Sequence, residues 1–276
     1  MPELPEVETQ CRFLRRAGII TLPITDVTVT WERTLGGMAR ESFAERLIGE
    51  HVSGILRRGK FIVIELSSGD SLLVHLRMTG SLVLRNSGSA GDIHDRVILN
   101  FGDIELAFHD PRKFGRVVLT SDPADLLGKL GPEPLDDELT PESFHAMLQS
   151  KHRQIKPLLL DQGFIAGLGN IYTDESLFLT GIHPQRVSST LSVKEASILL
   201  QSIRQTLLTG ISNGGTSLGG GEGNFRSGGS YGGNADALRV FMRTGKPCFR
   251  CGTPVERSVV GQRSTHICPN CQRMPG

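Results

Sequence analysis

The stretch FIVIELSSGDSLLVHL, residues 61–76, decides the fold of the N-terminal half. Two mostly apolar runs, FIVIEL and SLLVHL, flank Ser67-Ser68-Gly69-Asp70, a polar turn of the kind that joins antiparallel strands. VILNF and IELAF flank Gly102-Asp103 in the same way. Because such hairpins dominate residues 24–120 without alternating helices, the sequence predicts a β-sandwich and not a doubly wound sheet.

A helix is expected in front of this strand region. Residues 3–17 are predicted to be helical and to stop at Gly18, with one apolar face made of Leu4, Val7, Cys11 and Leu14. The strand region is followed by LGPEPLDDELTPESF, residues 130–144, which is rich in proline and acids. We interpret this stretch as a linker between the sandwich and a helical part.

The pattern beyond the linker is helical and then rich in glycine. Ser192 and Glu195 form a capping box before a helix that is expected to end at Gly210. Residues 213–234 are glycine-rich and are predicted to form a mobile loop. Its length between ordered elements makes a functional loop as good an interpretation as a plain flexible linker.

The charge of the chain is unevenly distributed. The 276 residues carry a formal net charge of only +1, yet the segment from residue 239 onward has seven basic residues against one acid, a local net charge of +6. A basic end on a neutral chain suits a positioned contact with phosphate, although a solvated basic tail would have the same composition.

No transmembrane or secretory segment is apparent. No apolar run approaches about eighteen residues. The chain opens with acids and prolines and lacks the basic and then apolar pattern of a signal peptide. A cytoplasmic protein is therefore expected, and a reducing compartment favours metal binding over disulfides for paired cysteines.

Four cysteines have the spacing of a zinc ribbon. They form two C-x2-C pairs separated by sixteen residues: Cys248, Cys251, Cys268 and Cys271. Four thiolates close a tetrahedral site with no open position, so the one Zn²⁺ is expected to be structural. This short segment has few large apolar side chains, and metal binding worth roughly 10–16 kcal/mol could supply its folding energy.

The N-terminus could react as a nucleophile. Initiator methionine is usually removed before a small residue, and its loss would expose Pro2 as a secondary amine with a pKa near 8. Such an amine attacks carbonyl-like carbons and gives a charged iminium. Glu3 and Glu6 lie beside it and could relay protons. Proline and glutamate are also favoured in a first helical turn for structural reasons alone.

Several short motifs, taken in their order along the chain, favour a functional interpretation of these observations. PELPEVET, RRGK, HLRMTG, DPRKFG, GNIYTDE and the C-terminal cysteines closely resemble the formamidopyrimidine-DNA glycosylase family over nearly the whole chain. The resemblance implies an α+β multidomain fold: an N-terminal antiparallel β-sandwich with its helix (1–132), a helix–two-turn–helix domain with the Gly-rich lesion-recognition loop (133–234) and a zinc ribbon finger (235–276).

The resemblance also implies an activity. The chain would be a base-excision-repair DNA glycosylase and abasic-site lyase that removes oxidised purines, namely 8-oxoguanine and formamidopyrimidines, through a Schiff base on Pro2 and β,δ-elimination. Glu3 would protonate the sugar ring oxygen, Lys60 would be the active-site lysine and Glu6 a supporting carboxylate. The partner would be double-stranded DNA with oxidised bases or abasic sites, bound by a cytoplasmic monomer of a bacterium.

The resemblance assigns the DNA contacts to seven residues. Met78, Arg112 and Phe114 match the residues that fill the gap left by an everted base, which suits a flexible thioether, a rigid guanidinium fork and an aromatic wedge. Phosphate contacts are expected from His75, Lys156, Asn170 and Arg263. Asn170 follows two glycines at a predicted helix start, where exposed backbone amides favour phosphate.

Two departures from the family pattern leave alternatives open. The loop LGGGEGNFRSGGSYGGNADAL is unusually glycine-rich, and VFMRTG replaces the usual VYGR pattern. An endonuclease VIII-like glycosylase for oxidised pyrimidines is therefore the nearest alternative, although such proteins typically have glycine at the position of Leu4. A non-catalytic lesion-binding protein is a second alternative, but it would not need Pro2, Glu3 and Lys60.

Overall fold

The computed structural model describes residues 1–218 and 225–274, and the chain divides into two compact units. The first unit consists of Met1–Gly128 with Ile211–Ala235, and the second of Lys129–Gly210 with Asp236–Gly276. Each unit is thus built from two separate segments of the chain. Among the described residues, no helix has the length and apolar character needed to cross a bilayer.

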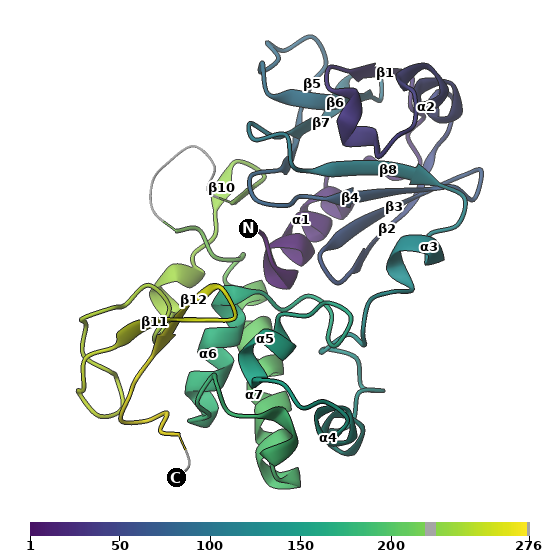
Figure 1. The fold of residues 1–276 in the computed structure, drawn as a ribbon. Helices are drawn as coiled ribbons and strands as arrows, with labels where there is room; N and C mark the ends of the chain where they lie inside the picture. Colours follow the sequence, from purple (N-terminus) through teal and green to yellow (C-terminus); the bar gives the residue numbers. More distant parts are fainter. Residues whose placement is uncertain (219–224, 275–276) are drawn as a thin grey trace. The chain divides into compact units, whose positions relative to one another are not determined.

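The first unit is an antiparallel β-sandwich (Figure 1). One sheet has the order β1-β6-β7-β5, formed by Asp26–Val29, Asp95–Asn100, Ile104–His109 and Ser81–Asn86. The other has the order β2-β3-β4-β8, formed by Val52–Arg58, Phe61–Leu66, Ser71–His75 and Arg116–Thr120. Apolar side chains of both sheets share one buried cluster, which includes Ile64, Val74, Leu99 and Phe108. The predicted sandwich is confirmed.

The two hairpins quoted from the sequence are both present. In the first, Phe61 lies opposite His75 and Glu65 opposite Ser71. In the second, β6 and β7 pair across the turn at Gly102. Alternation places one side of each strand in the shared core, because successive side chains point to opposite faces.

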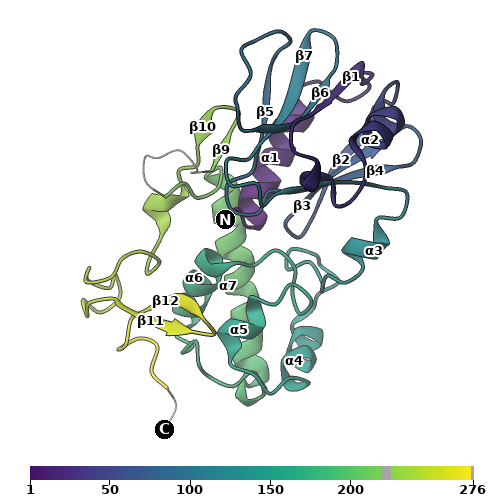
Figure 2. The ribbon, with the colours of Figure 1, turned by 45° about the horizontal axis from the view of Figure 1, so that its top comes forward.

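The N-terminal helix α1, Leu4–Arg16, packs against β2 and β3 (Figures 1 and 2). Its predicted apolar face is buried: Leu4, Val7, Cys11 and Leu14. Glu3 is the N-cap and Ala17 the C-cap, so the helix is shorter than predicted by one residue at each end. Burial and the nearby Glu8 carboxylate raise the pKa of the Cys11 thiol to about 12, consistent with a packing role.

Four α-helices lie wholly or almost wholly in the second unit. They are α4 (Pro141–Gln149), α5 (Ile155–Leu159), α6 (Asn170–Thr180) and α7 (Val193–Ser212). The proposed linker 130–144 is only partly a connection, because Thr140 caps α4 and Phe144 is fully buried. Arg204 also binds three carbonyl oxygens of this stretch, those of Pro134, Asp136 and Leu139.

The helix α7 begins as predicted and ends later. The Ser192 hydroxyl accepts from the Glu195 N–H, and the Glu195 carboxylate accepts from the Ser192 N–H, so the capping box is confirmed. Gly210 does not end the helix, which continues to Ser212. A Cβ at Gly210 would lie 2.6 Å from the Tyr172 ring, so this glycine allows a close approach of an aromatic side chain.

Shorter elements complete both units. They are the helices α2 (Arg40–Leu47) and α3 (Ala124–Leu127), the 3-10 turns Glu32–Leu35, Ser188–Thr190 and Asn234–Ala237, and the hairpins β9–β10 (Arg226–Ser227, Ser230–Tyr231) and β11–β12 (Glu256–Val260, Arg263–Ile267). The hairpin β9–β10 lies within the predicted Gly-rich loop, which is therefore partly ordered. Residues 219–224 of that loop lie outside the described residues.

Candidate active site and nucleic-acid interface

Two of the predicted catalytic residues, Pro2 and Glu3, lie at the start of α1. Pro2 and Glu3 are buried, whereas Met1 is half-exposed. Glu3 and Glu6 form a reciprocal capping box, in which the Glu3 N–H donates to Oε2 of Glu6 at 2.7 Å. Oε1 of Glu6 accepts from the Thr216 N–H at 2.7 Å. Glu6 therefore joins the start of α1 to the beginning of the Gly-rich loop.

Lys60 and His75 are both buried beside β3. Lys60 directly precedes β3, and His75 ends β4, with its ring edge-on to Phe61 at 4.7 Å between centroids. Nδ1 of His75 accepts from the Arg77 N–H at 3.0 Å, which leaves the proton on Nε2. Burial and the positive charges of Arg77 and Lys60 lower the pKa of His75 to about 3. His75 is therefore a neutral donor at physiological pH.

The low pKa of His75 gives a stability prediction. The unfolded protein binds a proton at this histidine below pH 6.5 and the folded protein does not, so folding stability falls as the pH drops through 6.5. Between pH 7.5 and 5.5 this loss amounts to about 1.4 kcal/mol. His75→Gln removes it, and urea unfolding of both zinc-loaded proteins at the two pH values measures the difference. Equal pH dependence of the two proteins would contradict the prediction.

The three predicted wedge residues lie together on the surface of the first unit. Nη1 of Arg112 is 3.5 Å from the sulfur of Met78, and its guanidinium carbon is 4.9 Å from the centre of the Phe114 ring. Met78 is 44% exposed and Phe114 is 49% exposed. Two half-exposed large apolar side chains around a cation have the chemistry of residues that insert into a base stack.

The backbone in front of two of the three wedge residues is in an unusual conformation. Arg77 and Lys113 directly precede Met78 and Phe114, and they have φ angles of 53° and 60°. A left-handed backbone costs a residue other than glycine about 1–2 kcal/mol. Such outliers accumulate at functional sites, where the surrounding structure holds them in place.

Asp110 connects the two wedge loops and was not singled out from the sequence. It is fully buried, and its carboxylate accepts from the Thr79 hydroxyl at 2.6 Å and from the Gly115 N–H at 2.7 Å. These two donors directly follow Met78 and Phe114. Asp110 therefore fixes the loops relative to one another, and its position at the head of DPRKFG, as a turn-forming aspartate, was the available signal.

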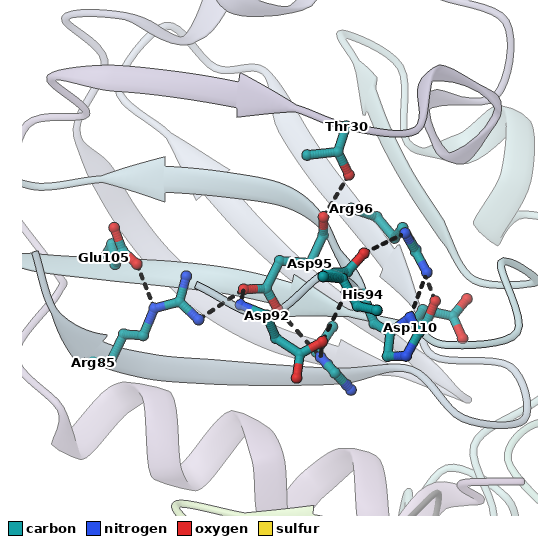
Figure 3. A network of polar contacts seen from close by, with 10 residues as sticks. Thr30, Arg85, Asp92, His94, Asp95, Arg96, Glu105 and Asp110 are labelled. Carbon is teal, nitrogen blue, oxygen red and sulfur yellow. Dashed lines mark hydrogen bonds and ion pairs between the residues drawn. The ribbon is translucent and has the colours of Figure 1, made fainter. Parts of the chain in front are cut away.

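A polar network extends from Asp110 along the sheet (Figure 3). Nε of Arg96 donates to the Asp110 carbonyl oxygen at 2.8 Å, and the Arg96 guanidinium also contacts His94. The buried Asp95 binds Arg85 at 2.7 Å, and Arg85 pairs in turn with Glu105. The network ties the loop before β6 to β5 and β7. It is connected to the two wedge loops through Asp110 and so supports them.

Two of the predicted phosphate residues bind one carbonyl oxygen in the second unit, and a third is its neighbour in the sequence. Nζ of Lys156 and Nδ2 of Asn170 both donate to the Ser264 carbonyl oxygen at 2.9 Å, and Arg263 is the preceding residue. Asn170 opens α6 behind its N-cap Gly169, as predicted. Arg263 is exposed at the start of β12. Lys156, by contrast, is fully buried and pairs with Asp174 at 2.6 Å.

Two adjacent acids on α6 were also missed. Asp174 binds Lys156 and the His266 N–H, and Glu175 accepts from three consecutive backbone amides, those of Arg239, Val240 and Phe241. Burial raises the pKa of Glu175. Both acids stand in the GNIYTDE motif, but periodicity alone does not show that a fully buried helix face carries carboxylates.

The four cysteines lie together, as the zinc-ribbon spacing predicts. Their sulfur atoms are all within 4.8 Å of one another among the described residues, and Cys248 and Cys268 are buried. The Arg250 N–H donates to the Cys248 sulfur at 3.4 Å, a bond that stabilises a metal-binding thiolate. The donor set fits one structural Zn²⁺, which would order the hairpin β11–β12.

Where VFMRTG departs from the family pattern VYGR, Met242 has a left-handed backbone conformation. It stands where the family pattern VYGR has glycine, with a φ of 56° and a side chain that is 60% exposed. Met242→Gly is expected to raise the free energy of unfolding by about 0.5–1 kcal/mol, because the left-handed strain exceeds the entropy cost of glycine. Urea denaturation measures the change. Met242→Ala keeps the strain, so an equal gain for alanine would contradict this explanation.

Family models match three consecutive parts of the chain. They are described as the formamidopyrimidine-DNA glycosylase N-terminal domain over residues 1–117, the formamidopyrimidine-DNA glycosylase H2TH domain over residues 130–220, and the zinc finger found in FPG and IleRS over residues 245–273. Together they cover most of the chain in the order that the motifs predict. The models also agree with the positions of the sandwich, the helices and the cysteines.

Similar proteins match the chain from end to end. Formamidopyrimidine-DNA glycosylases of Protochlamydia amoebophila and Herpetosiphon aurantiacus are each 43% identical over 276 residues, which is 99% of this chain and all of theirs. Two solved structures also cover 99% of this chain and all of their own at 36% identity. One is MutM in complex with DNA containing carbocyclic 8-oxo-G, with a TM-score of 0.91, and the other is Lactococcus lactis Fpg in complex with DNA containing an abasic site, with a TM-score of 0.90.

The fold, the buried N-terminal residues and these matches define the class of protein. The chain is a DNA glycosylase and abasic-site lyase of base-excision repair with one structural zinc site. More particularly, it belongs to the formamidopyrimidine-DNA glycosylase family.

Proposed function

We propose that this enzyme removes oxidised purines, 8-oxoguanine and formamidopyrimidines, from double-stranded DNA through a covalent intermediate on Pro2. The observation that carries the proposal is the start of α1, where Pro2 lies buried next in sequence to Glu3, which forms the capping box with Glu6. Removal of Met1 turns the Pro2 nitrogen into a secondary amine at this place. An α-amino group has a pKa near 8, so a useful fraction is unprotonated at neutral pH.

The reaction proceeds by displacement and then elimination. The Pro2 nitrogen attacks C1′ of the damaged nucleotide and loses its proton, and the base leaves with the electrons of the glycosidic bond and takes up a proton. Glu3 then protonates the sugar ring oxygen, so the C1′–O4′ bond breaks and the nitrogen lone pair forms the C1′=N⁺ iminium. The resulting iminium acidifies the C2′ proton, so loss of this proton expels the 3′ phosphate. A second elimination expels the 5′ phosphate and leaves a one-nucleotide gap. The reaction needs no redox cofactor.

The remaining predicted residues support this chemistry. The buried cation of Lys60 is assigned to the active site, and Glu6 holds the start of α1 in place. Met78, Arg112 and Phe114 fill the space left by the everted base, with Arg112 facing the orphaned partner base. His75 of the first unit and Asn170 and Arg263 of the second bind phosphates, and Lys156 contributes to DNA binding in the second unit. The three-part division 1–132, 133–234 and 235–276, a monomeric state and a bacterial cytoplasmic location complete the proposal.

Borohydride trapping tests the proposed function. Purified protein is mixed with a duplex that carries 8-oxoguanine opposite cytosine, and reduction of the iminium leaves a covalent protein–DNA band. A thymine glycol duplex runs in parallel. Stronger trapping on 8-oxoguanine supports the purine specificity, whereas trapping only on thymine glycol would move the substrate to oxidised pyrimidines. No adduct on either lesion or on an abasic site, with Pro2 confirmed as the N-terminus, would leave only a DNA-binding protein.

A further inference from the structure

A buried ion pair lies under the zinc-ribbon hairpin in the second unit. Nζ of Lys156 on α5 is 2.6 Å from Oδ1 of Asp174 on α6. The two side chains are 0% and 1% exposed. Charges are removed from water at a large cost unless they are paired and hydrogen-bonded, so such a pair calls for an explanation.

Both charged side chains of the pair also bind the backbone of β12. Nζ of Lys156 donates to the Ser264 carbonyl oxygen at 2.9 Å, and Oδ2 of Asp174 accepts from the His266 N–H at 2.9 Å. Nδ1 of His266 lies 3.3 Å from the same oxygen. Asn170 adds a second donor to the Ser264 carbonyl oxygen. Two helices thus hold the strand residues that directly follow Arg263.

The turn of the hairpin rests on α5 as well. A Cβ on Gly261, whose φ is 56°, would lie 2.6 Å from Cγ of Pro157. The hairpin and the helix therefore approach so closely that only glycine fits without a shift. Figure 2 shows β12 beside α5 and α6, and contacts between α6 and β12 agree with this placement. The position of Arg263 is consequently set by α5 and α6 in addition to the zinc site.

The geometry leaves little room for Lys156 to bind a phosphate itself. To reach solvent its ammonium would leave the Asp174 carboxylate, and an unpaired buried carboxylate is strongly unfavourable. Its contacts with Asp174 and Ser264 would also be lost. The same cation can instead contribute to DNA binding by fixing the hairpin that presents Arg263, an exposed and fully charged donor suited to phosphate.

We propose that Asp174 is a positioning residue for DNA binding and that the Lys156–Asp174 pair is an internal clamp that sets the place of Arg263. The inference rests on the proposed binding of DNA by this unit. Lys156 then acts through β12 and makes no phosphate contact of its own. Arg263 is the group that touches the DNA backbone, and Asn170 shares the clamp through the Ser264 carbonyl oxygen.

Replacement of Asp174 separates the clamp from simple electrostatics. Asp174→Asn keeps an oxygen for the His266 N–H and removes a negative charge. If the carboxylate had no positioning role, the loss of a negative charge would leave binding of the polyanion unchanged or slightly stronger. The clamp requires the opposite result. We expect Asp174→Asn and Lys156→Met each to weaken binding of a lesion duplex about tenfold, because each loses the ordered Arg263 contact.

The full-length, zinc-loaded variants are compared by fluorescence anisotropy over a range of salt concentrations. The double variant Lys156→Met/Asp174→Asn leaves neither charge unpaired, so it is expected to bind no more weakly than either single variant. Arg263→Gln is expected to cost about tenfold in the wild-type background and little in the Asp174→Asn background.

Two controls separate a specific effect on DNA binding from a general loss of folding. Zinc content and thermal unfolding show whether each variant is folded. If a single variant does not fold, the double variant is used to test the clamp. Arg153→Gln removes an exposed ion pair with Asp161 in the same unit and should change nothing. Wild-type affinity in Asp174→Asn, or a loss confined to Lys156→Met with a salt slope lower by about one, would overturn the clamp. Failure of the wild-type protein to bind DNA would instead count against the proposed function.

Discussion

Blocking the Pro2 nitrogen is expected to abolish both base excision and strand cleavage. An N-terminal extension that is not removed turns this nitrogen into a tertiary amide, which has no lone pair for attack on C1′. Loss of an essential nucleophile typically lowers kcat by a factor of about 10³ or more. The borohydride-trapped band should disappear with the activity, because no iminium forms.

The same extension at the C-terminus is the matched control and should leave trapping intact. DNA affinity should change little in the N-terminally extended protein, since the wedge and phosphate residues lie elsewhere in the sequence. Mass spectrometry confirms which residue begins each protein. Residual trapping at the wild-type level by a fully extended chain would place the nucleophile on another amine, and the buried Lys60 would become the first candidate.

Removal of zinc is expected to unfold the hairpin β11–β12 and to abolish specific DNA binding. The four cysteine sulfur atoms lie together in the same finger, and metal binding contributes roughly 10–16 kcal/mol to the folding of such modules. Arg263 stands on this hairpin, so its phosphate contact should be lost together with the metal. Hydrogen exchange of residues 256–267 and DNA anisotropy, before and after chelation, measure both effects.

Substitution at individual cysteines provides the control for chelation. Cys268→Ser should reproduce the loss of zinc and of DNA binding, whereas Cys11→Ala should keep both. Cys11 is buried in the sandwich with a raised pKa, so it neither binds metal nor reacts readily with thiol reagents. Zinc-free protein that retains full protection of 256–267 would show that packing against α6 alone folds the hairpin.

Most of the fold could be predicted because its signals are local. The hairpin turns at 67–70 and 102–103, the capping box at Ser192 and the paired cysteines each depend on neighbouring residues. The family resemblance added the order of the domains, and the models and relatives confirm the family. Predictions failed where a distant side chain decided the outcome, as at Gly210, where the Tyr172 ring and not a helix end explains the glycine.

The candidate site was predicted as a set of residues and not as an arrangement. Motif matching placed Met78, Arg112 and Phe114 in one function, and they do lie together. The same approach did not single out Asp110, whose carboxylate holds the two loops in place. It also made Lys156 a surface contact, whereas the side chain is fully buried. The roles of these residues stay predictions until they are tested.

The sequence by itself determined the two hairpins, the N-terminal helix, where zinc binds and which family the chain resembles, because periodicity, turn residues and cysteine spacing act over a few residues. Only the tertiary structure decided which charges are buried and paired. The burial of Lys156 against Asp174 depends on contacts among α5, α6 and β12, which come from positions about 20 to more than 100 residues apart. Whether a charged side chain faces water or another charge is a property of that packing, and no local pattern encodes it.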